Sequence, residues 1–248
     1  MLKKEPVVGI FDSGVGGFSV VKEIRKSSDA TIVYYGDCAR APYGNKSQEE
    51  IAEYIKDDIT FLQEKGVTHF INACNSMSVL ATDALLKKCK VDISMYTDMI
   101  RAFDAHAIFS KEDKVLVLAT CATIRSGMYQ EVLTRKGVSV FEYAFSQLAF
   151  AIENNATRDE LLAIIKKGMM YAQEVNATHI VYACTHYPLV HGLFVIAQEE
   201  VGWKGEYINP AVYVSKEMRK WKLEGERKFY PYSSKDTAVF IKNVIQFL

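Results

Sequence analysis

The chain has 248 residues with 30 basic and 30 acidic side chains, so its formal net charge is zero. This balance provides no basic surface for nucleic acid or an anionic membrane, and we expect neither partner. The longest apolar runs, such as residues 114–123, are too short to span a bilayer, and the first residues show no signal peptide, so a cytoplasmic globular protein is expected.

Short β-branched or apolar runs alternate with helical periods along the chain. The predicted strands are residues 7–11, 31–35, 69–73, 92–96, 114–119, 138–143, 180–183 and 206–209. The predicted helices are residues 19–26, 48–65, 78–88, 126–136, 158–174, 189–201 and 237–248. This alternation predicts an α/β fold built from βαβ units, with parallel sheets covered by helices on both faces.

The sequence contains an internal duplication. Residues 61–75 return as residues 171–185, with every shared residue at one offset of 110 (184 − 74). The matched pairs are Gln63/Gln173, Glu64/Glu174, Thr68/Thr178, His69/His179, Ala73/Ala183 and Cys74/Cys184. Val7-Val8 and Val117-Leu118 extend the same offset weakly to the first strand of each half. Each copy predicts a helix followed by a buried strand that ends in a cysteine.

The duplication predicts two α/β domains. We expect the first to comprise residues 1–97 and 212–248, because the C-terminal helix can pack back on the first half, and the second to comprise residues 98–211. Ligands of parallel α/β sheets bind beyond the carboxyl ends of the strands. A thiol at each strand end can therefore lie on either side of one substrate. The histidines of the repeat stand at strand starts, and we expect them to be structural.

The chain has five widely spaced cysteines and no CxxC pair. A disulfide framework and a zinc site are both disfavoured, and no metal is expected. Isolated thiols in a reducing compartment are usually part of the core, which is our expectation for Cys38, Cys89 and Cys121.

Residues 11–19, Phe-Asp-Ser-Gly-Val-Gly-Gly-Phe-Ser, follow the first strand and open a helix. The glycines allow close backbone approach, and free amides at a helix start favour an anion. The GxGxxG spacing of dinucleotide loops is missing, so a small carboxylate is the better candidate. The alternative is an ordinary βα turn in which Asp12 caps the helix.

The two repeated cysteines share one setting. Cys74 and Cys184 each stand where a strand gives way to a helix, which favours thiolate over thiol and a pKa below the usual value of about 8.5. His186 can hold or relay a proton. A single cysteine at a strand end is more often structural, but its recurrence in a duplicated frame favours chemistry. Nearby donors suited to carboxylate oxygens are Asn75, Ser76 and Thr185.

Two further loops could contribute to a pocket. Pro42 fixes a turn in residues 39–44, Gly44 provides a hinge, and Tyr43 could cover the pocket, although a surface β-turn explains the same residues. Thr120 and Thr123 occupy the second-half position equivalent to the Asp12-Ser13 turn, where hydroxyls could bind the same ligand.

Residues 11–17, 35–44, 73–76 and 183–189 form four motifs in the order found in glutamate racemases of the aspartate/glutamate racemase superfamily. The chain resembles that family from about Val7 to Pro210. The resemblance implies a cofactor-independent enzyme with two pseudo-symmetric α/β domains and an active site in the cleft between them. It also implies interconversion of L- and D-glutamate, which supplies D-glutamate for peptidoglycan and thereby for cell-wall biogenesis and cell shape.

The resemblance assigns catalytic roles to five residues. Cys74 and Cys184 would be the two acid/base thiols, Asp12 would assist the first, His186 would assist the second, and Glu153 would support His186. The positions that match the substrate pocket are Asp12, Ser13, Pro42, Tyr43, Gly44, Asn75, Ser76, Thr123 and Thr185. No cofactor is implied, and a homodimer is compatible with the sequence.

The sequence departs from the family pattern at three places. Ser76-Met77 stands where the family usually has Thr-Ala, residues 94–99 lack the usual Gly-Val-Ile-Glu-Pro, and residues 145–151 lack the usual Pro. These departures leave two alternatives to glutamate racemisation. The substrate could be aspartate, a hydantoin or another small acid, or the protein could bind a ligand without turning it over.

Overall fold

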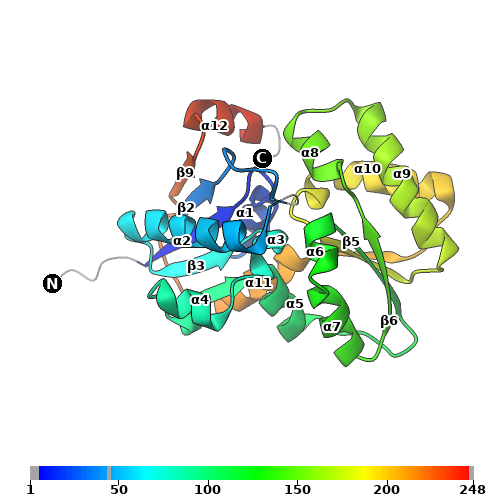
Figure 1. Ribbon diagram of the computed structural model, residues 1–248, viewed down its shortest axis with the longest axis horizontal. Coiled ribbons are helices and arrows are strands. Elements are labelled where there is room, and N and C mark those ends of the chain that lie inside the picture. Colours follow the sequence, from blue (N-terminus) through cyan, green and yellow to red (C-terminus); the bar gives the residue numbers. More distant parts are fainter. Residues whose placement is uncertain (1–5, 44–45, 246–248) are drawn as a thin grey trace.

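The computed structural model describes residues 6–43 and 46–245, so Gly44 lies outside the described residues (Figure 1). These residues form two parallel β-sheets that lie side by side, each with helices on both faces. The first sheet contains the N-terminal half and the C-terminal segment, and the second contains the intervening chain. This arrangement confirms the predicted fold class.

The first sheet has the strand order β4-β3-β1-β2-β9, and all of its pairs are parallel. Its strands are β1 (Val7–Asp12), β2 (Thr31–Gly36), β3 (His69–Asn72), β4 (Tyr96–Asp98) and β9 (Phe229–Ser233). One face packs against α1 (Phe18–Arg25), α5 (Met99–His106), α11 (Pro210–Arg219) and α12 (Thr237–Ile245). The other face packs against α2 (Gln48–Glu64), α3 (Asn75–Ser78) and α4 (Asp83–Lys88). Burial on both faces explains why β1 and β2 are almost continuously apolar.

The second sheet has the strand order β6-β5-β7-β8, also parallel throughout. Its strands are β5 (Lys114–Ala119), β6 (Ser139–Ala144), β7 (His179–Ala183) and β8 (Glu206–Ile208). One face is covered by α8 (Leu148–Glu153), α9 (Arg158–Glu174) and α10 (His191–Val201), the last preceded by a 3₁₀ turn at Tyr187–Val190. The other face is covered by α5 and α7 (Met128–Arg135), with α6 (Cys121–Arg125) leading into α7.

Helix α5 belongs to the cores of both halves. Met99 and Ala102 pack against the first sheet, whereas Ile100 and Phe103 pack against the second. One helix therefore joins the two cores, and the side chains that it gives to each are fully or almost fully buried. Asp98 fixes its start by accepting hydrogen bonds from the backbone N–H groups of Ile100 and Arg101.

The duplication is present in three dimensions. α2 and α9 each have 17 residues and each begins with a capping box, formed by Ser47 with Glu50 and by Thr157 with Glu160. The strand order β4-β3-β1-β2 matches β8-β7-β5-β6. Both repeat histidines stand at strand starts, and each ring Nδ1 lies 2.9 Å from the hydroxyl of the preceding threonine. A structural role for these histidines fits that position.

The register corrects one detail of the repeat. Val8 pairs with His69 and Val115 pairs with His179, so the first strands correspond at an offset of 107 (115 − 8) while the repeat histidines keep 110 (179 − 69). Val7-Val8 and Val117-Leu118 are therefore not equivalent. The connection between first and third strand is three residues longer in the second half, which a sequence alignment at one fixed offset cannot accommodate.

Several predicted elements differ from those observed. The strand predicted at 92–96 begins only at β4, because the Asp92 carboxylate accepts a hydrogen bond from the Ser94 N–H and forms a 3₁₀ turn. The helix predicted at 78–88 begins only at α4 (Asp83), where the Thr82 hydroxyl caps the start by accepting from Leu85 N–H, while α3 ends at Ser78. The sequence patterns did not predict α3, α5, α6, α8, α11 or β9.

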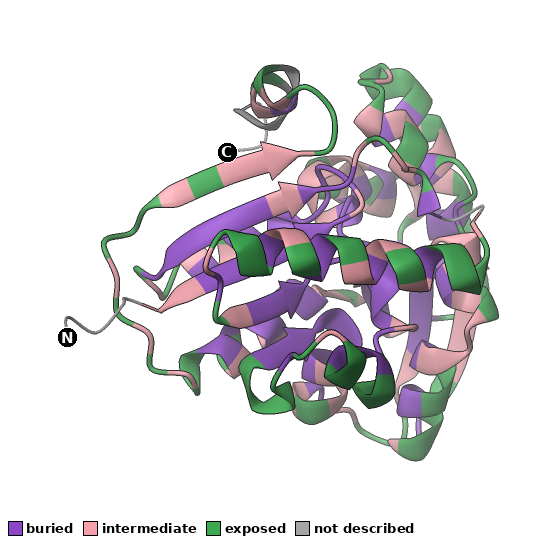
Figure 2. Cartoon of the chain, turned by 60° about the vertical axis from the view of Figure 1, so that its left-hand side comes forward, coloured by how far each residue is buried: buried purple, intermediate pink, exposed green. Residues whose placement is uncertain are grey.

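The C-terminal segment returns to the first sheet. β9 pairs with β2 at the sheet edge, and α12 follows it. Figure 2 shows the inner strands as buried and β9 as only intermediate or exposed, as an edge strand should be. We keep the boundaries 1–97 plus 212–248 and 98–211 as a proposal, which the place of β9 supports.

The two capping boxes provide a matched pair for a stability test. Ser47→Ala and Thr157→Ala should each lower the free energy of unfolding by about 1 kcal/mol, because each leaves a backbone N–H at a helix start without its acceptor. Urea unfolding followed by circular dichroism measures the change. Thr60→Ala, at an exposed helix-interior position, is the control and should stay within about 0.5 kcal/mol of the parent. A loss of unfolding free energy in only one of the two capping-box variants would contradict the equivalence of the two helices.

Candidate active site

A cavity of about 1380 Å³ lies where the carboxyl ends of the two sheets face each other. Both repeat cysteines line it, Cys74 after β3 and Cys184 after β7. The other predicted residues on its wall are Ser13, Pro42, Tyr43, Asn75, Ser76, Thr120, Glu153, Thr185 and His186. Asp12 and Thr123 are buried behind this wall. The structure thus gathers the predicted residues that it describes around one space.

Cys74 is held as a buried thiol. Its Sγ donates to Ser13 Oγ at 3.5 Å, and its backbone N–H donates to Asn72 Oδ1 at 3.1 Å. Burial, together with the negative charge of Asp12, raises the pKa of the Cys74 thiol to about 12. The expected depression is therefore wrong for Cys74, because α3 has only four residues and its weak dipole does not outweigh desolvation.

Asp12 links the first thiol to the opposite half. Its Oδ1 accepts the Gly14 N–H at 2.9 Å, and its Oδ2 accepts the Thr185 hydroxyl at 3.1 Å. Burial raises the pKa of the Asp12 carboxyl, and the nearby positive charge of His186 opposes this shift. Asp12 is thus a buried carboxyl next to Cys74 with a pKa closer to neutrality than usual.

Cys184, His186 and Glu153 form a hydrogen-bonded chain. The Cys184 Sγ lies 3.7 Å from His186 Nδ1, and His186 Nε2 lies 2.6 Å from Glu153 Oε1. Burial alone would lower the pKa of His186, but its contacts with Cys184 and Glu153 raise it well above the usual value. Burial likewise opposes ionisation of Glu153, yet His186 and the Val15 N–H bring its pKa below the usual range. His186 thus lies between the Cys184 sulfur and a carboxylate that favours the protonated form of its ring.

The glycine loop after β1 receives an anion from the chain itself. The Val15 N–H donates to Glu153 Oε1 at 2.8 Å, across the boundary between the two sheets. A Cβ on Gly14 would lie 2.0 Å from that oxygen, and one on Gly16 would lie 2.5 Å from His186 Nδ1. The close approach expected of a ligand carboxylate is therefore made at Val15 by Glu153, and the glycines make room for the opposite half.

Hydroxyl and amide groups join the two halves beside the cavity. Ser76 Oγ lies 3.1 Å from Thr120 Oγ1 and 3.4 Å from Thr123 Oγ1, and the Tyr129 hydroxyl donates to Asn75 Oδ1 at 2.7 Å. The Asn75 Nδ2 group is buried and has no hydrogen-bond partner among the described residues. A buried donor without a partner is costly, so this amide is well suited to a ligand oxygen.

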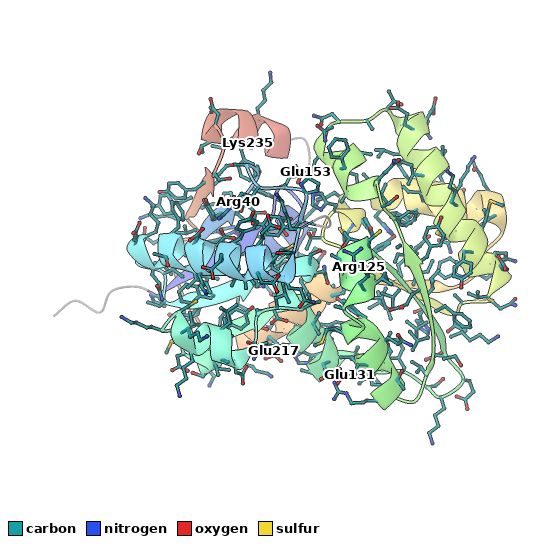
Figure 3. The ribbon with its side chains drawn as sticks, in the orientation of Figure 1. Arg40, Arg125, Glu131, Glu153, Glu217 and Lys235 are labelled. Carbon is teal, nitrogen blue, oxygen red and sulfur yellow. The ribbon has the colours of Figure 1, made fainter. Side chains whose placement is uncertain are left out.

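Some lining residues were not predicted. Cys38 and Cys89 pack against the core as expected, but Cys38 also lines the cavity, and Cys121 lines it without belonging to a core cluster. Cys38 follows shortly after the predicted strand 31–35, and this location at a strand end could have indicated that it lines the cavity. The C-terminal segment adds Ser233, Lys235, Asp236 and Phe240, which β9 and α12 bring back to the first sheet. Figure 3 shows Lys235 on this segment and Glu153 on α8 near the junction of the halves.

The described part of the chain holds neither a candidate metal site nor a helix that could span a membrane. No group of three or more His, Cys, Asp and Glu residues there could hold a metal ion. None of the helices described is long and apolar enough to cross a membrane.

Two duplicated parallel-sheet halves with paired buried thiols in one cavity define a two-domain α/β protein built to act on a small polar molecule. A sequence model of the Asp/Glu/hydantoin racemase family matches residues 17–201. The chain therefore belongs to this family, and the expected class of enzyme, an amino-acid racemase, is confirmed at the level of the family.

The chain is similar to several glutamate racemases. It is 36% identical to that of Lactobacillus helveticus over 212 residues, covering 84% of this chain and 77% of the relative. It is 35% identical to that of Koribacter versatilis over 198 residues, covering 78% and 67%. Glutamate racemase from Francisella tularensis, solved with D-glutamate, superposes with a TM-score of 0.83 at 26% identity, covering 100% of this chain and 94% of that one. These similarities confirm the resemblance that the motifs carry.

The His186–Glu153 contact predicts a shifted titration. Glu153→Gln should lower the pKa of His186, because the imidazolium loses its charged partner. NMR titration of the His186 ring measures this, with the distant His69 ring as internal control. Because the folded-state pKa is raised, the contact stabilises the fold below the usual histidine pKa, and this stabilisation is lost as pH rises through the folded value. An unchanged His186 titration in the variant would contradict the assignment.

Proposed function

We propose that this protein interconverts L- and D-glutamate without a cofactor, with Cys74 and Cys184 as the two acid/base groups. The observation that carries the proposal is that two buried thiols, from equivalent strand ends of a duplicated fold, line one cavity from opposite halves. The choice of glutamate is supported by the relatives, which are glutamate racemases, and by the D-glutamate in the Francisella tularensis structure.

The reaction needs two groups because the α-carbon must lose a proton on one face and gain one on the other. A single group would mostly return its proton to the same face. The α-proton is very weakly acidic, so the barrier is mainly the cost of the carbanion. Preorganised donors around the α-carboxylate, among them Asn75 Nδ2 and the Ser76 hydroxyl, would stabilise an enediolate-like state. Enclosure between the two halves excludes water and strengthens these interactions.

Each direction of the reaction needs one thiol and one thiolate. Burial and Asp12 favour the neutral thiol at Cys74, so in one direction Cys74 is the proton donor and Cys184, which lies beside the His186 ring, is the base. In this direction Cys184 removes the α-proton while Cys74 delivers one to the opposite face. Turnover leaves the reverse distribution, with the thiolate at Cys74 and the proton at Cys184. Resetting the site returns a proton to Cys74 and removes one from Cys184, and Asp12, whose charge acts on Cys74, would assist the first of these two steps.

The biological role follows from the product. Glutamate racemases supply D-glutamate, which is a component of peptidoglycan. We therefore propose a cytoplasmic enzyme that supports cell-wall biogenesis and cell shape. Its partner is the small-molecule substrate, and assembly as a homodimer is compatible with this role.

A second candidate is racemisation of another small acid such as aspartate. Met77 and residues 94–99 do not favour it, because Met77 is fully buried in the core against α2 and residues 94–99 do not line the cavity, whereas Ser76 lines the cavity and keeps a hydroxyl. The third departure does bear on the substrate, since Phe145 and residues 149–151 are part of the cavity wall. Substrate choice therefore needs a direct comparison.

Removing either thiol tests the two-thiol proposal. Cys74→Ala and Cys184→Ala should each lower kcat for glutamate racemisation by about 100-fold or more, because each variant lacks one acid/base group. Circular dichroism follows racemisation, and calorimetry should show that D-glutamate still binds. Cys89→Ala, which removes a thiol outside the cavity wall, is the matched control and should retain activity. Racemisation at the parent rate in either cavity variant would exclude the two-thiol model.

A substrate panel tests the choice of glutamate. We expect kcat/KM for L-glutamate to exceed that for L-aspartate by about tenfold or more, the usual discrimination for one methylene. Initial rates with each enantiomer of both acids provide the measurement. Preference for aspartate would move the function to the second candidate, and binding without turnover of any acid would identify a non-catalytic member of the family.

A further inference from the structure

A charged cluster next to the cavity takes no part in the proposed proton transfers. It consists of Asp37, Arg40 and Asp58, and Figure 3 labels Arg40 on the first half of the molecule. The Asp37 and Asp58 side chains are fully buried, and the Arg40 side chain is 26% exposed. Buried charges are retained only where partners offset their desolvation, so this cluster calls for a physical explanation.

Arg40 connects the segment after β2 to helix α2. Its Nε donates to Asp37 Oδ2, and its Nη2 donates to Asp58 Oδ1 at 3.1 Å. Its Nη1 donates to the exposed Asp57 at 2.6 Å, and its guanidinium lies over the Tyr54 ring with 4.2 Å to the centroid. A planar guanidinium with contacts on this many sides holds one geometry far better than a flexible cation would.

The same cluster holds Tyr43. The Tyr43 hydroxyl donates to Asp37 Oδ2, the oxygen that also accepts from Arg40. Its ring packs against Tyr54 with 5.3 Å between centroids. Residues 38–42 form turns and coil rather than part of a helix or strand, and Cys38, Ala41, Pro42 and Tyr43 line the cavity. The position of this wall therefore depends on side-chain contacts with Asp37 and Arg40.

The charges in the cluster are not balanced if every acid is ionised. One guanidinium then faces two buried carboxylates, so one of the two should hold a proton. Among the described residues, Asp37 accepts two donors at one oxygen, whereas Asp58 accepts only from Arg40. The geometry thus favours the anion at Asp37. In agreement, burial and the charge of Asp37 raise the pKa of Asp58 well above its usual value.

We propose that Arg40 and ionised Asp37 are positioning residues that fix Tyr43 on the cavity wall for substrate binding, with Asp58 as a neutral acid beside them. The part that concerns substrate rests on the function proposed above. The charge assignment leads to an unequal effect of two isosteric changes. Asp58→Asn preserves a neutral side chain of the same shape, whereas Asp37→Asn removes the anion on which Arg40 and Tyr43 converge.

Steady-state kinetics with glutamate test the effect on substrate. Arg40→Gln and Asp37→Asn should each raise KM by about tenfold while kcat stays within about threefold, the pattern of lost binding rather than lost chemistry. Asp58→Asn should keep both constants within about twofold of the parent. Arg135→Gln is the matched control, because Arg135 is 58% exposed and pairs with Asp104 at the surface of the second half. Equal effects of the two asparagine variants, or a fall in kcat alone, would overturn the proposal.

Hydrogen exchange provides a readout that does not depend on activity. In Arg40→Gln and Asp37→Asn, peptides covering residues 37–43 should exchange faster than in the parent, while peptides from β5 and β7 should not change. Unchanged exchange of residues 37–43 in both variants would overturn the positioning role. A parent protein that turns over no acid would remove the proposed function, and the exchange experiment would still decide whether the cluster holds this segment.

Discussion

The site depends on contacts that cross from one sheet to the other at the carboxyl ends of the strands. Asp12 accepts from Thr185, Val15 donates to Glu153, and Ser76 meets Thr120, so each half supplies polar partners to residues of the other. Because parallel strands all end at the same edge of a sheet, a duplicated fold whose edges face each other brings equivalent residues together. The two thiols are a direct consequence of this geometry.

Symmetry of the backbone does not extend to the chemistry of the thiols. The glycines after β1 leave space for Glu153 and His186, whereas the equivalent turn after β5 carries Thr120. Cys184 consequently has an imidazolium within reach, and Cys74 has a buried carboxyl and a serine hydroxyl instead. An enzyme that must run equally well in both directions can accept this difference, because one thiol and one thiolate are needed in either direction.

The sequence predicted the elements whose signals are local. β5 and α9 were predicted to the residue, since β5 is an unbroken apolar run and α9 starts at a capping box. β9 was missed because it contains Pro231 and lies at a partly exposed edge, where the apolar pattern is weak. α11 was also missed, although Asn209 followed by Pro210 is a helix-start signal and the Asn209 side chain does cap the helix.

The candidate site was predictable in position but not in its electrostatics. The motifs placed Cys74 and Cys184 at strand ends, where the structure has them. The raised pKa of Cys74 depends on burial by both halves and on Asp12, which no local pattern encodes. The same holds for Glu153 at the Val15 amide and for the C-terminal residues on the cavity wall, because these contacts join positions far apart in the sequence.

Incorporation of solvent deuterium tests the two-thiol account most directly. The protein would be incubated with L-glutamate in D₂O and both enantiomers analysed by NMR at low conversion. Two opposed thiols predict that the D-glutamate formed carries deuterium at the α-carbon while the remaining L-glutamate keeps its proton. Retention of the proton in D-glutamate, or exchange of L-glutamate as fast as D-glutamate forms, would contradict the account.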